Sequence, residues 1–435
     1  MNRAVSGPAS ENQTRLDNRL IRGLGFLGLV AATFNCTVGG GIFKLPEIVY
    51  ALVGTASPIV YLLCFTVMMM IIGVFILVGS ETTESGGPYA YVEPVLGPYL
   101  GFLCGLLLWL LAVFAMASVA TAYAGFTASL VGCDTVTGRA VVLIVTIVAF
   151  AALNSRGVKT GSGLSIVLSI AKLLPLVVLI AVGIPHLQAT RLALPSHLDT
   201  PSIARATMML VFAFAGAESA LIPSGEIRDP KRTLPRALLT AMGGVLILYG
   251  LIQAVAQSAL GAGLAHTGGA PLVAAAEQLM GPGGRELLLI GAALSTAGFL
   301  SAMMMGVPRS LFAFAEKGYL PAVFASVGET SRVPVVAIWT QAAITLILAL
   351  SNGFEKLAIL ANLSAILMYL TCACAAIKLK WKGPFTASKL IPWLALAPML
   401  FLLTSVKAGE WASVLGLLVL GSLFYCRRAR KLSKV

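Results

Sequence analysis

The sequence predicts an all-α membrane protein with about twelve transmembrane helices, arranged as a five-plus-five inverted repeat with two additional helices. Three observations support this fold class. Of the 435 residues, 58% are hydrophobic and only 11% are charged, which leaves too little polar surface for a soluble domain of this length. The apolar residues are grouped in runs of about 20, the length that crosses a bilayer as a helix. The first and the sixth of these runs are interrupted by glycine, proline and charged residues.

Each apolar run is expected to form one transmembrane helix. The approximate ranges are 24–50, 54–79, 98–131, 139–153, 161–184, 202–222, 237–260, 286–308, 334–351, 355–377, 386–405 and 409–425. The corresponding organisation is a cytoplasmic tail at 1–22, an inverted-repeat core at 23–385, a final helix pair at 386–426 and a basic cytoplasmic tail at 427–435.

The net charge of +13 is explained by membrane topology rather than by a nucleic-acid partner. With twelve crossings both termini lie on one side, and 22 of the 30 Lys and Arg residues fall in the tails and loops of that side. Because basic residues concentrate in cytoplasmic loops, we expect both termini in the cytoplasm. The short tails suit a bacterial inner membrane. The lipid bilayer is an expected partner, and no nucleic acid or required protein partner is predicted.

The two interrupted runs predict a ligand site. They read "NCTVGGGIFKLPE" (Asn35–Glu47) and "FAFAGAESALIPSGE" (Phe212–Glu226). Irregular backbone at membrane depth is tolerated only where it lines a protein cavity, and interrupted segments at corresponding places of two halves indicate a transporter binding site. Freed amides favour an anion and freed carbonyls a cation, so a site with both suits a zwitterion such as an α-amino acid. The alternative, glycines that only allow close helix packing, stays open.

Four motifs carry a resemblance to a known family. They are "GGGIFKLP" (39–46), "ESGGPYAYVEPVLGPYLGFLCGLLLW" (84–109), "FAFAGAESALIPSGEIRDPKRTLPRAL" (212–238) and "PRSLFAFAEKGYLP" (308–321). In this order, over about residues 20–380, they resemble the signatures of the amino acid–polyamine–organocation (APC) superfamily of secondary transporters. The resemblance implies a permease with twelve helices and the five-plus-five inverted repeat. It also implies a small-molecule amino acid as the ligand.

The resemblance further implies which residues form the substrate site. The carboxylate would bind backbone amides near Val38, Gly39, Gly40 and Gly41, and the amine would meet carbonyls near Thr37, Phe212, Ala213 and Ala215. Phe212 or Phe214 would close over the ligand. The arginine exchangers of the family use tryptophan in their gates, whereas all five Trp residues of this chain lie elsewhere, which disfavours arginine exchange.

Two charged residues inside the predicted crossings are candidates for proton coupling. A charge near the bilayer centre should face a cavity or a partner, and the resemblance assigns such a role to Lys172 and to Glu218. For Lys172 the alternative is an ammonium that extends to the cytoplasmic surface, and for Glu218 it is a structural hydrogen bond. Lys44 and Glu47, three residues apart, are expected to pair with each other.

The leading prediction is a secondary active transporter that moves neutral amino acids by alternating access, with proton symport. The alternative is an exchanger of amino acids, including cationic amino acids or polyamines, and a non-transporting amino acid sensor is less favoured. No enzyme activity is predicted, because the sequence has no His or paired-carboxylate constellation near a predicted surface. The expected driving force is a proton gradient or a counter-substrate, without a cofactor or a metal site.

Overall fold

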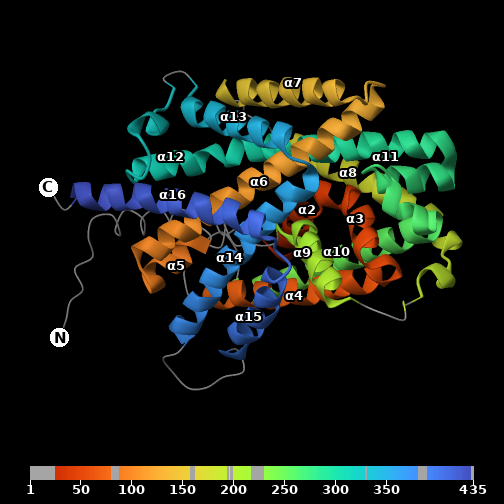
Figure 1. Ribbon diagram of the computed structural model, residues 1–435, viewed down its shortest axis with the longest axis horizontal. Helices are drawn as coiled ribbons and strands as arrows, with labels where there is room; N and C mark the ends of the chain where they lie inside the picture. The colour runs from red at the N-terminus through yellow and green to blue at the C-terminus, as the bar shows by residue number, and fades with distance from the viewer. Residues whose placement is uncertain are drawn as a thin grey trace.

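The computed structural model describes residues 25–79, 88–156, 162–193, 195, 199–216, 230–328, 331–380 and 389–432. Regular structure in these ranges is helical (Figure 1). The first helices are α2 (Phe26–Thr37), η1 (Gly40–Phe43), α3 (Leu45–Val53), α4 (Ser57–Gly79), α5 (Pro88–Leu96), α6 (Pro98–Leu130), α7 (Val136–Ser155) and α8 (Ser162–Gly183). They are followed by α9 (Thr200–Phe214), α10 (Pro230–Leu260), α11 (Pro271–Gly306), α12 (Pro308–Glu316), α13 (Val335–Ser351), α14 (Phe354–Lys380), α15 (Leu390–Leu403) and α16 (Ala408–Leu432). Short 3₁₀ turns, such as η7 (Gly261–His266), connect several of them.

The lengths and apolar composition of these helices agree with a multi-pass membrane protein. Among the described residues, seven helical segments are long and apolar enough to cross a membrane, and five shorter apolar helices accompany them. Two of the short helices, α2 and α9, are the first parts of the interrupted first and sixth runs, so they are short because each run is broken. The number of twelve crossings and the inverted repeat stay predictions.

The core is built around α6 and α14, which pack against each other. Helix α6 also contacts α11, α13 and α7, and it runs obliquely through the molecule in Figure 1. Of the apolar window of α14, 78% of the residues are buried, compared with 17% for α7 and 11% for α16. The outer faces of α7 and α16 therefore suit contact with lipid, where apolar side chains need no protein partner.

A helical segment that the sequence did not predict precedes the eighth predicted crossing. The apolar run begins near residue 286, whereas α11 begins at Pro271 and is broken at Gly281 (φ 70°, ψ −160°). Gly281 precedes Pro282, and a residue before proline is disfavoured in the α conformation. Glycine adopts the positive φ without a steric penalty. The break thus separates a preceding helical segment from the predicted crossing.

Close packing of α8 against α11 predicts a specific effect of one methyl group. At Gly291 a Cβ would overlap the ring of Pro175, whereas at Gly243, in α10, a Cβ would meet nothing within 4 Å. We expect Gly291→Ala to destabilise the protein by about 1–3 kcal/mol through overpacking. Gly243→Ala should be neutral or stabilising, since alanine favours a helix. Thermal denaturation of the detergent-purified variants measures both, and equal melting temperatures would contradict the prediction.

Candidate functional site

The first break lies where the sequence predicts it. Helix α2 ends at Thr37, and Val38 leaves the helical conformation with ψ 87°. The chain then forms the 3₁₀ turn η1 and resumes an α-helix at Leu45, with Pro46 in the first turn. Proline is tolerated there because the first-turn amide needs no intrahelical acceptor. The interruption of the first run is therefore confirmed.

The three glycines of this break have different surroundings. A Cβ at Gly40 would lie 2.7 Å from Thr296 Cγ2 of α11, and one at Gly41 would lie 3.0 Å from the ring of Phe212. Close packing thus favours glycine at these two positions, more strongly at Gly40 than at Gly41. At Gly39 a Cβ would meet nothing closer than the Thr37 carbonyl oxygen, at 4.0 Å. Gly39 is thus the glycine of this motif that close packing does not explain.

The second break faces the first. Helix α9 ends at Phe214, Ala215 is extended (φ −65°, ψ 154°), and Gly216 has φ 111°. A Cβ at Gly216 would lie 2.7 Å from the carbonyl oxygen of Cys36 in α2. Glycine is needed there for its positive φ and for this close approach. The structure thus brings the predicted residue Thr37 next to Gly216, although about 180 residues separate them in sequence.

A tyrosine that the motifs did not single out joins the two breaks. The hydroxyl of Tyr249, in α10, lies 3.1 Å from the carbonyl oxygen of Thr37 and 3.2 Å from that of Ala213, and it donates to both. Tyr249 is fully buried. The sequence offers only a weak signal, a tyrosine within an apolar run. A buried hydroxyl usually takes a hydrogen-bond partner, but Tyr61 shares this pattern and has none among the described residues. Gln253 and Gln257 follow it at four-residue spacing and are also buried.

Lys172 approaches the first break from α8. Its ammonium donates hydrogen bonds to the carbonyl oxygens of Asn35, at 2.6 Å, and Val38, at 2.7 Å. These are carbonyls at the C-terminal end of α2, where unpaired oxygens and the helix dipole both favour a cation. The ammonium therefore lies at the break rather than at the cytoplasmic surface, which was the alternative. Glu218, the other candidate for proton coupling, lies outside the described residues.

The two candidate gate phenylalanines have different positions. Phe212 is half-buried, lies against Gly41 and packs edge to face on Phe354 of α14, with ring centroids 5.5 Å apart. Phe214 is fully buried and packs on Tyr249, at 5.4 Å between centroids. Phe212 therefore lies beside the first break, whereas Phe214 packs on the tyrosine that joins the two breaks.

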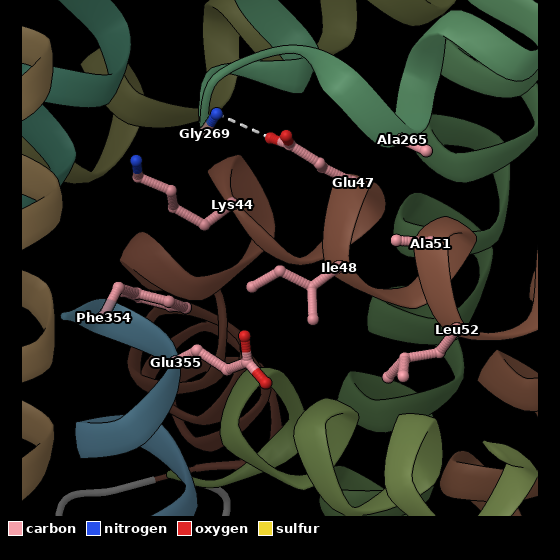
Figure 2. A pocket seen from close by; sticks show the side chains of 9 residues that line it. All are labelled: Lys44, Glu47, Ile48, Ala51, Leu52, Ala265, Gly269, Phe354 and Glu355. Atoms are coloured by element: carbon pink, nitrogen blue, oxygen red, sulfur yellow. Dashed lines mark hydrogen bonds between the residues drawn. The ribbon is translucent and has the colours of Figure 1, made fainter.

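A pocket of about 340 Å³ adjoins Phe354, on the face that the charge distribution predicts to be extracellular, which we call the predicted outer face. Its lining consists of Lys44, Glu47, Ile48, Ala51, Leu52, Ala265, Gly269, Phe354 and Glu355 (Figure 2). The expected pairing of Lys44 with Glu47 is wrong. The Glu47 carboxylate instead accepts hydrogen bonds from the Thr267 hydroxyl, at 2.6 Å, and the Gly269 amide, at 2.7 Å. The Lys44 ammonium lies over the ring of Phe126.

Comparisons with known proteins identify a family and several similar transporters. The family model described as "Amino acid permease" matches residues 24–419. The serine/threonine exchanger SteT of Bacillus subtilis (strain 168) is 26% identical, covering 96% of this chain and 99% of that protein. The methylthioribose transporter of the same organism is 25% identical, covering 95% and 94%. Its branched-chain amino acid permease BcaP is 22% identical, covering 96% and 95%.

The shared hydrogen bond of Tyr249 generates a prediction about stability. Tyr249→Phe leaves the buried carbonyls of Thr37 and Ala213 without this donor, and we expect a loss of about 1–3 kcal/mol. Tyr61→Phe is the matched control. Tyr61 is also fully buried, and its hydroxyl has no hydrogen-bond partner among the described residues. Melting temperatures of the purified variants test the difference, and an equal effect of both substitutions would refute the bridging role of Tyr249.

Proposed function

The chain belongs to the amino acid permease family, and from this premise we propose that it is a secondary transporter of neutral amino acids, driven by proton symport. The proposed ligand site lies where the two broken helices meet. The amides of Val38–Gly41 bind the carboxylate, and the carbonyls near Thr37, Phe212, Ala213 and Ala215 receive the amine. Phe212 closes over the ligand from the side of the pocket.

The hydrogen bonds of Lys172 to the first break are the main support for the proposed proton coupling. One ammonium holds the carbonyls of Asn35 and Val38, so the charge state of a single side chain affects the backbone that is proposed to hold the ligand. An ammonium makes charge-assisted bonds that are stronger than those of a neutral amine. Loss of its proton therefore weakens the hold on the break. Glu218 is proposed as a second group in the same coupling.

Neutral amino acids are supported by the surroundings of the proposed site and by the relatives. The described side chains at the second break are alanine and phenylalanine, which offer an apolar environment to a ligand side chain. Two of the relatives carry names that specify serine/threonine and branched-chain amino acids. Exchange of amino acids is the second candidate mechanism, favoured by the exchanger name of SteT.

The proposed location is the bacterial inner membrane, with both termini in the cytoplasm. This orientation follows from the concentration of Lys and Arg in the loops of one side. It places the pocket beside Phe354 on the extracellular face, from which the ligand would approach the breaks.

Uptake of labelled amino acids into proteoliposomes tests the proposed function. The vesicles are prepared with and without an inward proton gradient, and with and without internal amino acid. Uptake that depends on the gradient supports symport. Uptake that requires internal amino acid and ignores the gradient makes the protein an exchanger. Absence of amino acid uptake under all four conditions refutes the proposal and directs attention to other ligands, such as methylthioribose.

Lys172→Ala is expected to abolish gradient-driven uptake, because no side chain then links protonation to the first break. Lys378→Ala, which removes an exposed lysine near the end of α14, is the matched control and should transport normally. Initial rates at several external pH values separate coupling from folding. A Lys172→Ala variant that keeps full stimulation by the gradient would exclude the coupling role.

A further inference from the structure

A largely buried ion pair on the predicted outer face joins α9 to α16. Arg205 Nη2 lies 2.7 Å from Glu410 Oε1, and Nη1 lies 2.9 Å from Oε2, so the contact is bidentate. The two side chains are only 12% and 10% exposed. The pair connects the first part of the interrupted sixth run with the final helix pair, which is predicted to lie outside the inverted-repeat core.

Both partners make further hydrogen bonds that fix the geometry of this contact. Arg205 Nη1 also donates to the carbonyl oxygen of Ser405, at 3.1 Å, and the amide of Lys407 donates to Glu410 Oε2, at 2.8 Å. Glu410 lies in the first turn of α16, where the helix dipole stabilises a carboxylate. Exposed ion pairs contribute little to structure, whereas a bidentate and mostly buried pair adds geometric specificity.

The pair is connected to the proposed ligand site through α9. Arg205 and Phe212 are seven residues apart, which is about two helical turns, so they lie on the same side of α9. Phe212 lies against Gly41 and Phe354, and the next residue, Ala213, accepts the hydrogen bond of Tyr249. A shift of α9 on loss of the Arg205 contact would move Phe212 relative to Gly41.

We propose that Arg205 is a positioning residue for ligand binding from the predicted outer face. Its bond to Glu410 holds α9 in the position in which Phe212 covers the first break, so the final helix pair determines how the site meets a ligand arriving from the pocket. Glu355, which lines the pocket, lies 4.0 Å from the same guanidinium and is the neighbouring acceptor if the bond to Glu410 opens. The inference rests on the proposed function.

Glu410→Gln tests the positioning role, because it removes the charge and keeps the shape of the side chain. We expect the KM for external amino acid, measured in cells, to rise about tenfold or more, since small displacements at a site have large effects. The KM on the inner side, measured in inside-out vesicles, should change less than about twofold, because the proposed role concerns only ligand that arrives from the outer face. The double variant Arg205→Met with Glu410→Met restores packing without charge. It should be stable and still show the raised external KM.

Control measurements separate this inference from the proposed function. Glu277→Gln disrupts a more exposed ion pair with Arg285 within α11, at 3.8 Å, and should leave both KM values unchanged. Labelling of Met209→Cys, at a buried position of α9, by a thiol reagent reports movement of α9 without any transported ligand. Peptide mass spectrometry separates this signal from the exposed native cysteines Cys36, Cys374 and Cys426. Faster labelling when Glu410→Gln is added supports the positioning role of Arg205 even if amino acid uptake is absent. An unchanged external KM and an unchanged labelling rate in the folded double variant would overturn the proposal.

Discussion

Carbonyl oxygens released from a helix inside an apolar layer need new hydrogen-bond donors, and the arrangement of this molecule follows from how two such sets of oxygens are satisfied. The end of α2 receives the Lys172 ammonium at Asn35 and Val38, and it receives the Tyr249 hydroxyl at Thr37. The end of α9 receives the same hydroxyl at Ala213. Because these donors come from α8 and α10, both helices have to pack beside the breaks. Neither break is held by its own run alone.

The remaining helices form a frame around this pair of breaks. Asn362 of the buried helix α14 donates to the carbonyl oxygen of Met208 in α9, at 2.6 Å, and Ser118 of α6 donates to that of Phe354 at the start of α14, at 2.9 Å. Thr296 of α11 packs on Gly40. The short helix α9, most of whose residues are buried, is thus held at Met208 by a side chain of a helix that is itself deeply buried. This support allows a segment of 15 residues to keep a fixed position.

The sequence was sufficient to locate both breaks, because runs of glycine and charge interrupt otherwise apolar segments, and to place Lys172 among the intramembrane charges. It could not identify the partners of Lys172, since these are backbone oxygens 134 and 137 residues away, and a carbonyl carries no residue-specific signal. The role of Tyr249 was missed for the same reason, because its two acceptors are also backbone oxygens. The expected Lys44–Glu47 pair failed because spacing on a helix does not exclude a competing loop, and Thr267 and Gly269 supplied better donors to Glu47.

The hydroxyl of Tyr249 has one proton for two acceptors, and this has a thermodynamic consequence. Any event that draws the Thr37 oxygen away strengthens the bond to Ala213, and an event at Ala213 acts on Thr37 in the same way. The two oxygens compete for one donor, so their occupancies are linked. Linkage of this kind is reciprocal in free energy. If one molecule binds at the first break and another at the second, each therefore changes the affinity for the other by the same factor. This coupling needs no longer pathway between the two breaks.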